Sequence, residues 1–249
     1  MAACISTVPV GECPGGHAFA ICPCYIWALP ASAPGFPEGW QVRLLLLGAT
    51  GLVGSHAMDH AIADERIDEV IAPVRRALQA RPGLVSPQVD FEQLPDDPSC
   101  WQADAAICAL GTTMKKAGSR EAFRRVDHGF VLEAARMAHR HGVRTFVLNS
   151  AMGADPGSRF FYSRVKGELE RDLQQVGFDS LTLVRPGLIG GEREEFRLGE
   201  HVATLVLGAL GPVLPRKWRI NPAGRIAAVM IEAAVAGKPG VASIESGAI

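Results

Sequence analysis

Long runs of like charge and long apolar runs are both absent from this 249-residue chain. Its 25 Lys and Arg nearly balance its 26 Asp and Glu, which leaves a formal net charge of −1. No apolar run comes near the ~20 residues that a membrane-spanning helix needs. We therefore expect no nucleic-acid partner and no membrane partner, and we expect a globular protein of the cytoplasm.

Lysine and arginine are also absent from residues 1–41, which hold four of the six cysteines: Cys4, Cys13, Cys22 and Cys24. A secretory signal would begin with basic residues, so export is not expected. The spacing Cys-Pro-Cys differs from the two-residue spacer usual for zinc, and we expect no metal; a metal-binding module remains an alternative that rests on these cysteines alone. We interpret residues 1–41 as a disordered extension or as sequence ahead of the true start, and residues 42–249 as one domain.

From Arg43 onward, short apolar segments alternate with longer stretches of helical period. This alternation predicts βαβ units and therefore an α/β fold with a doubly wound parallel sheet, the Rossmann fold. The predicted strands are residues 43–48, 69–75, 89–94, 105–110, 145–150 and 181–185. The predicted helices are residues 52–63, 119–141, 158–176 and 225–236, with Gly177 as the C-cap of the third and a short strand after the fourth. Cys100 and Cys108 are expected to be buried, reduced thiols.

A glycine-rich loop follows the first predicted strand directly and opens the first predicted helix. Its sequence is Gly48-Ala49-Thr50-Gly51-Leu52-Val53-Gly54. Glycine at the first position permits a tight turn, at the second permits close approach of a pyrophosphate, and at the third permits close packing of helix on strand. The free N–H groups of the helix N-terminus then face the anion. This loop predicts a dinucleotide-binding site, although its spacing differs by one residue from Gly-x-Gly-x-x-Gly.

Two arginines, Arg75 and Arg76, stand at the end of the second predicted strand. An NAD-selective site has an acidic residue near this point to bind the ribose hydroxyls, whereas a guanidinium accommodates a 2′-phosphate. We therefore expect NADP(H) to be preferred over NAD(H). Asp90 and Glu92 remain alternative acidic partners for the ribose.

Tyrosine and lysine are scarce, with two and five residues, yet Tyr162 and Lys166 lie four residues apart. On a helix this spacing places both side chains on one face. A phenol ionises near pH ~10, so it exchanges protons poorly at neutral pH unless a nearby cation stabilises the phenolate. Ser150 ends the fifth predicted strand, at the sheet edge where ligands bind. We predict that Tyr162 is a general acid, Lys166 its activating cation and Ser150 the hydrogen-bond donor to a carbonyl oxygen.

At these residues the sequence resembles the short-chain dehydrogenase/reductase superfamily, in its atypical NAD(P)H-binding branch. Further motifs are similar to the Tat-interacting-protein oxidoreductase family over about residues 42–235: Phe91-Glu92-Gln93-Leu94, Leu110-Gly111-Thr112-Thr113, Lys116-Ala117-Gly118, Arg125-Val126-Asp127, Gly153-Ala154-Asp155, the segment 162–168 and Arg185-Pro186-Gly187. The resemblance implies the same fold and a nicotinamide cofactor.

The resemblance also assigns roles to single residues. Residues 50–53 would contact the pyrophosphate, Leu110 and Gly111 the adenosine side, and Tyr162 and Lys166 the ribose. The nicotinamide end would be lined by Pro186, Ile189 and Arg197. Asp127 departs from the wider superfamily, which often has an asparagine thereabouts to organise a proton-relay water, and a carboxylate would alter that relay.

Two functions follow from these observations. The first is an NADPH-dependent oxidoreductase that reduces a small carbonyl substrate or oxidises the corresponding alcohol. The alternative is an NADPH-binding redox sensor that acts through a protein partner without turnover. The Ser/Tyr/Lys set favours the enzyme, because a sensor needs no proton donor beside the nicotinamide. Either a monomer or a homodimer is compatible with the sequence.

Overall fold

Short aliphatic segments form a seven-stranded sheet in the computed structural model, which describes residues 40–190 and 220–249. The sheet order is β3-β2-β1-β4-β5-β6-β9, and every neighbouring pair is parallel. The strands are β1 (Val42–Leu47), β2 (Ile67–Ile71), β3 (Leu84–Val85), β4 (Ala105–Cys108), β5 (Thr145–Asn149), β6 (Ser180–Arg185) and β9 (Gly240–Glu245). A separate parallel pair joins β7 (Ile189–Gly190) to β8 (Asn221–Pro222). This topology confirms the predicted Rossmann fold.

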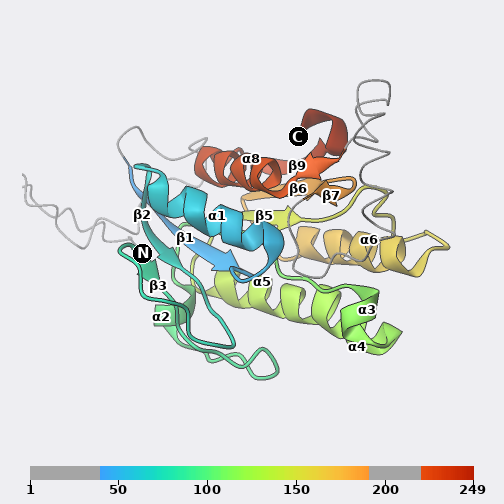
Figure 1. Cartoon of the computed structure of the whole chain (residues 1–249), viewed down its shortest axis with the longest axis horizontal. Coiled ribbons are helices and arrows are strands. Elements are labelled where there is room, and N and C mark those ends of the chain that lie inside the picture. Colours follow the sequence, from blue (N-terminus) through green and yellow to red (C-terminus); the bar gives the residue numbers. More distant parts are fainter. Residues whose placement is uncertain (1–39, 191–219) are drawn as a thin grey trace, which may run out of the picture. The chain divides into compact units, whose positions relative to one another are not determined.

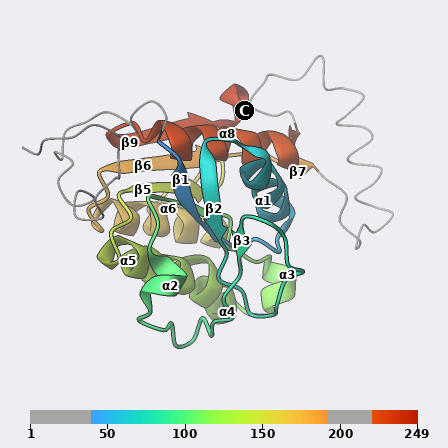
Figure 2. The ribbon, with the colours of Figure 1, turned by 90° about the vertical axis from the view of Figure 1, so that its left-hand side faces the viewer.

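Helices cover both faces of the sheet (Figures 1 and 2). One face is covered by α1 (Leu52–Ala63) and α8 (Ala223–Ala236), and the other by α5 (Val131–Arg140) and α6 (Phe161–Gln174). Shorter elements complete the described part of the chain: α2 (Pro98–Trp101), α3 (Met114–Ala117), α4 (Arg120–Arg124), the π-helical turn η2 (Arg125–Phe130) and the 3-10 turn η4 (Ser246–Ala248).

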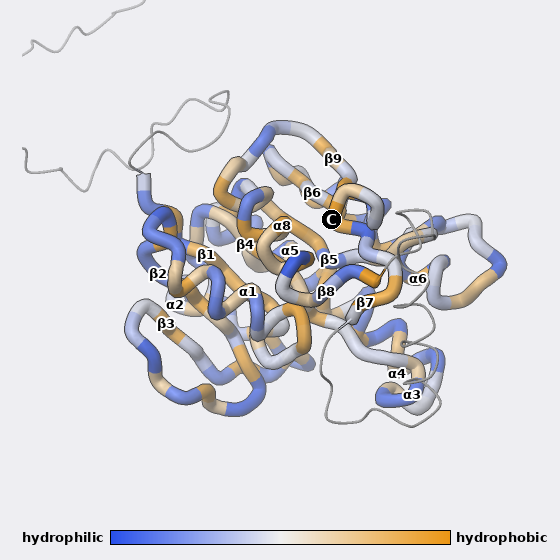
Figure 3. Tube along the Cα trace, turned by 45° about the horizontal axis from the view of Figure 1, so that its top comes forward, coloured by the Kyte–Doolittle hydropathy of each residue, from blue (hydrophilic) through white to orange (hydrophobic). Residues whose placement is uncertain are grey.

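Strand side chains alternate between two hydrophobic cores. In β1, Leu44 and Leu46 pack in the core that contains α1 and α8, whereas Leu45 and Leu47 pack in the core that contains α5 and α6. All four side chains are fully buried. Figure 3 shows the same contrast, with hydrophobic strands inside and hydrophilic loops around them. A parallel sheet buried on both faces needs such an unbroken apolar run, which is why β1 was recognisable from sequence.

Two predicted elements are corrected by the structure. The predicted strand 89–94 is wrong: Val89 and Phe91 are buried, but this segment forms only one isolated bridge, between Asp90 and Gln93, and the edge strand is β3, Leu84–Val85. The period-2 pattern reported burial of alternate side chains rather than sheet pairing. The predicted helix 119–141 begins at Arg120, with Ser119 as its N-cap, and a π-helical turn divides it into α4, η2 and α5. A single wide turn has no sequence period of its own, so it was not predicted.

The other boundaries moved by a few residues. Helix α1 has the predicted bounds, α8 begins two residues earlier than predicted, and α6 begins three residues later and ends at Gln174. The C-cap of α6 is Gln175 rather than Gly177, which has φ +96° two residues further on. Cys100 and Cys108 are buried free thiols, as expected. Residues 1–39, with their four cysteines, lie outside the described residues.

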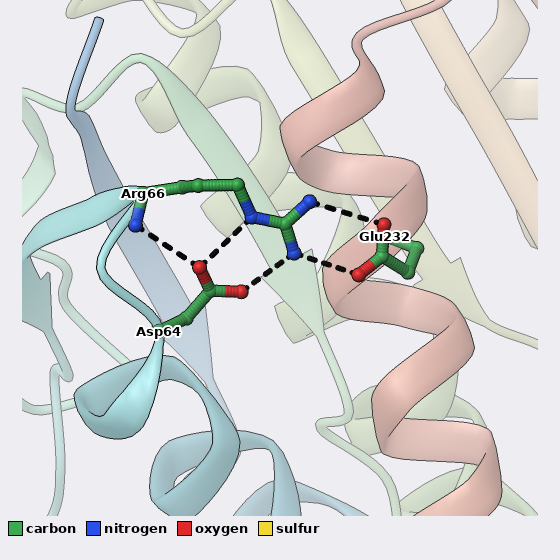
Figure 4. Close-up of polar contacts among 3 residues, drawn as sticks. All are labelled: Asp64, Arg66 and Glu232. Carbon is green, nitrogen blue, oxygen red and sulfur yellow. Dashed lines mark hydrogen bonds and ion pairs between the residues drawn. The ribbon is translucent and has the colours of Figure 1, made fainter. Parts of the chain in front are cut away.

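Arg66 joins the two helices on the α1–α8 face (Figure 4). Its guanidinium pairs with Asp64, just after α1, at 2.7 Å and with Glu232 of α8 at 2.6 Å. The hydrogen bonds from Arg66 hold the pKa of both carboxyls below their usual values. Because the side chains of Glu232 and Arg66 are exposed to water, we assign the Arg66–Glu232 ion pair at most ~1 kcal/mol of stability.

Candidate functional site

The glycine loop forms the turn from β1 into α1. Gly48 has φ +86°, a conformation that L side chains rarely adopt, and its carbonyl accepts a 2.9 Å hydrogen bond from the N–H of Gly51. Gly51 is the N-cap of α1 and is exposed, and no side chain caps this helix. The N-terminal N–H groups of α1 are therefore open to an anion.

Gly54 is required by packing inside the same turn. A Cβ at this position would lie 2.0 Å from the Gly48 carbonyl oxygen. The structure thus supports the predicted role of the third glycine, close packing of helix on strand. The first position also has a packing role, because a Cβ on Gly48 would lie 2.6 Å from the Leu110 nitrogen after β4.

We expect Gly54→Ala to lower the free energy of unfolding by ~1–3 kcal/mol, the usual cost of overpacking. Urea denaturation would measure the change. Gly129→Ala is the matched control, because a Cβ on this helical glycine would meet nothing within 4 Å. The control should be neutral or stabilising by up to ~1 kcal/mol. Equal destabilisation of the two variants would contradict the packing argument.

Arg75 and Arg76 lie just beyond β2, after the isolated bridge that joins Val74 to Gln88. Both are exposed, and neither forms a hydrogen bond or ion pair with another residue of the described chain. Two guanidiniums without an ion-pair partner among the described residues are suited to a phosphate. Asp90, by contrast, closes a local turn with Gln93 and Glu92, and Glu92 pairs with Arg125.

Asp127 lies in the π-helical turn η2, and its carboxylate contacts the loop that follows β4. One of its carboxylate oxygens accepts a 2.7 Å hydrogen bond from the N–H of Thr112, and a Cβ on Gly111 would lie 3.1 Å from the other oxygen. Gly111 and Leu110, which were predicted near the adenosine, therefore lie in a loop that is fixed by Asp127. Asp127 itself is buried.

Tyr162 and Lys166 lie on α6 as predicted. The Lys166 ammonium is buried and forms a 2.8 Å ion pair with Asp127. Burial alone would lower the pKa of Lys166, but the negative charge of Asp127, aided by Tyr162, more than offsets this and raises it. Tyr162 is 42% exposed, and its ring packs on the buried Phe123 of α4, with 5.7 Å between centroids. The structure therefore places a charged lysine and an accessible phenol on one helix.

Ser150 is buried directly after β5 and is engaged by another residue of α6. Its hydroxyl donates a 2.5 Å hydrogen bond to Glu170. Arg185, at the end of β6, binds the same carboxylate through two nitrogens, at 3.0 and 2.6 Å. Ser150 is thus close to α6, but its proton is directed at Glu170 in this structure. Sequence reasoning did not identify Glu170, since a glutamate on an amphipathic helix is usually solvated.

The segment after β6 is held by Asn221 of β8. The Asn221 side chain accepts a 2.8 Å hydrogen bond from the N–H of Gly187 and contacts Ser246 of η4. This fixes the buried Pro186 and the β7 residue Ile189, two of the three residues predicted near the nicotinamide. The third, Arg197, lies outside the described residues.

Gly167 explains part of the motif that follows Tyr162. A Cβ on this residue would lie 2.3 Å from the backbone of Asp155 and Pro156. Only glycine lets the loop after Ser150 pack so closely on α6, beside Lys166. The sequence motif contained this glycine, but only the tertiary contact shows its reason.

Within residues 40–190 and 220–249, no group of three or more His, Cys, Asp or Glu side chains could hold a metal ion. In the same residues, no helix is both long and apolar enough to cross a membrane.

Comparison with known proteins gives consistent matches. A family model described as NAD(P)H-binding matches residues 48–204. The protein Fmp52 of Aspergillus niger, named mitochondrial, is 38% identical over 183 residues, 70% of this chain and 77% of the relative. The protein HTATIP2 of Rattus norvegicus is 36% identical over 180 residues, 70% of this chain and 72% of the relative.

Solved structures support the fold. MoeE5 in complex with UDP-glucose and NAD superposes with a TM-score of 0.63 at 15% identity, covering 81% of this chain and 75% of that one. The UDP-glucose 4-epimerase of Thermotoga maritima gives 0.60 at 13% identity, covering 82% and 77%. The fungal names do not confirm a cytoplasmic location, which stays a prediction.

Proposed function

The chain belongs to the NAD(P)H-binding family, with relatives that include HTATIP2 and Fmp52, and from this premise we propose that it is an NADPH-dependent oxidoreductase of short-chain dehydrogenase type that reduces a small carbonyl substrate. The observation that carries the proposal is the arrangement on α6. An accessible phenol, Tyr162, lies one turn from a buried lysine whose charge is held by Asp127.

The residues present fit a phosphorylated dinucleotide. The uncapped N-terminus of α1 and the exposed Gly51 suit a pyrophosphate. Arg75 and Arg76 suit a 2′-phosphate and carry the proposed preference for NADP(H). When bound, NADPH supplies a hydride from its nicotinamide ring to the carbonyl carbon.

The protein supplies the proton and the charge stabilisation. Tyr162 gives its hydroxyl proton to the substrate oxygen, so the carbonyl becomes an alcohol. The Lys166 ammonium stabilises the phenolate that this transfer leaves. Ser150 donates a hydrogen bond to the same oxygen once its hydroxyl turns away from Glu170. In the reverse direction, the phenolate accepts the proton of an alcohol.

The surroundings of Tyr162 favour an apolar substrate. Phe160, two residues before Tyr162, is 78% exposed. Phe161 packs on Phe123 at 5.8 Å between ring centroids. Exposed large side chains near a candidate site often contact ligand. We propose an aldehyde, ketone or quinone with an apolar body.

The test is NADPH oxidation, followed at 340 nm, against a broad panel of aldehydes, ketones and quinones. Turnover of any member supports the reductase and begins to define the substrate. NADPH binding without turnover of any member would contradict it and favour the alternative, an NADPH sensor that acts through a protein partner.

A further inference from the structure

We propose that Asp127 is a positioning residue that fixes the Lys166 ammonium beside Tyr162 as a permanent charge, rather than as a link that passes protons to water. This inference rests on the proposed function for its kinetic consequence. The effect of Asp127 on the charge of Lys166 can be tested without a substrate.

The geometry gives Asp127 two tasks at once. One carboxylate oxygen pairs with Lys166 at 2.8 Å, and the other accepts the N–H of Thr112 at 2.7 Å. Both oxygens are therefore used, and both side chains of the ion pair are almost fully buried, at 6% exposure for Lys166 and 2% for Asp127. The carboxylate of Asp127, a residue of η2, thus links the loop after β4 to α6.

The π-helical turn is what brings Asp127 to this position. Its wider turn interrupts the long helical segment between Ser119 and Arg140 only at residues 125–130, and Asp127 is its one buried residue. Gly111 leaves room for the carboxylate, because a Cβ there would already lie 3.1 Å from it. A local break in helix geometry, matched by a glycine on the facing loop, is the arrangement expected of a functional position.

The charges around Lys166 come from three elements. Asp127 faces it from η2, Tyr162 from α6 and Cys108 from β4. The Cys108 thiol is neutral because burial raises its pKa to about 12. Asp127 is therefore the anion that keeps Lys166 charged among these three groups at neutral pH.

The consequence concerns the route of the proton. A lysine with a raised pKa, enclosed with its counter-ion, does not release its proton at working pH. Tyr162, which is 42% exposed, can instead regain its proton directly from water. Where the wider superfamily often has an asparagine that organises a relay water, Asp127 would supply a fixed charge instead.

The direct test is a titration of Lys166 by NMR of protein labelled with 13C-lysine, which has only five lysines to resolve. The Lys166 signal is assigned by its absence in Lys166→Arg. In the wild type we expect no titration of this signal below pH ~10.4, the ordinary lysine value. A wild-type midpoint below that value would overturn the proposal, and this measurement needs no substitution at position 127.

Asp127→Asn should lower the Lys166 midpoint by at least ~2 pH units, because a buried lysine without a counter-ion loses its charge easily. The asparagine can still accept the N–H of Thr112. Asp172→Asn is the matched control: Asp172 pairs with His128 at 2.9 Å and joins the same two elements, η2 and α6, away from Lys166. An unchanged midpoint in Asp127→Asn, or an equal shift in the control, would overturn the proposal.

With a substrate in hand, the pH profile of kcat/KM supplies a second readout. At alkaline pH, activity is expected to fall as Lys166 loses its proton, because the neutral amine no longer stabilises the Tyr162 phenolate. In Asp127→Asn this fall should move to lower pH by the same amount as the Lys166 midpoint. A uniform loss at all pH values would indicate a merely structural role and would overturn the proposal. If no carbonyl is turned over by the wild type, the proposed reductase fails while the NMR result still decides the role of Asp127.

Discussion

Replacing Tyr162 with phenylalanine should lower carbonyl turnover at least ~100-fold, the scale of general acid–base catalysis. The physical reason is that phenylalanine has no proton to donate to the substrate oxygen. Affinity for NADPH should stay nearly intact, because most of the proposed cofactor contacts lie on the glycine loop and beyond β2. Steady-state NADPH oxidation and a fluorescence titration of NADPH measure the two quantities.

The substitution is mild for the fold. The ring of residue 162 packs on Phe123 at 5.7 Å, and phenylalanine keeps that contact. Tyr25→Phe provides the control, since Tyr25 is the other tyrosine of the chain and its substitution removes the same hydroxyl group elsewhere. Unchanged turnover in Tyr162→Phe would remove Tyr162 from the mechanism, and a similar loss in Tyr25→Phe would show that the effect is not specific to the α6 site.

Changing Arg75 and Arg76 together to alanine should weaken NADPH binding by roughly 10- to 100-fold, since hydrogen bonds to charged groups contribute ~1.5–3 kcal/mol. NADH lacks the 2′-phosphate, so its affinity should change little. Isothermal titration with both nucleotides at one ionic strength measures the difference. The prediction follows from the exposure of both guanidiniums and from their lack of a partner in the described chain.

Arg81→Ala is the control for general loss of positive charge near β2. Arg81 belongs to the same connection between β2 and β3 but is neutralised by Asp59 at 2.6 Å. Its removal should leave both nucleotide affinities close to the wild-type values. Equal losses for NADPH and NADH in the double variant would contradict the 2′-phosphate role.

The most regular parts of the fold were predictable because a parallel sheet imposes local patterns. Buried strands such as β1 are continuous aliphatic runs, and the glycines of the β1–α1 turn are required by one local backbone path. Helix α1, whose start is fixed by that turn, was predicted with its observed bounds. The fold class and the cofactor loop were therefore accessible without coordinates.

The edge of the sheet was less predictable. Val89 and Phe91 have strand-like alternation because they fill the α5–α6 core from a loop, whereas β3 is only two residues long. Period alone reports which side chains are buried and not which backbone groups pair. Short edge elements therefore need tertiary structure for their assignment.

The catalytic candidates divide in the same way. Tyr162 and Lys166 were found from their four-residue spacing, which the α6 helix converts into proximity. Ser150 was found from its place at the end of β5, but the carboxylate that binds its hydroxyl, Glu170, was not. Glu170 is twenty residues distant and is surrounded on α6 by charged residues that look like a solvated face.

The sequence by itself determined the α/β fold, the glycine-rich turn and the Tyr162–Lys166 pair, because each depends on residues close together in the chain. Only the tertiary structure decided that Asp127 pairs with Lys166 and that Glu170 binds Ser150 and Arg185. A buried charge is stable only beside a partner that folding brings to it, and local sequence does not specify that partner.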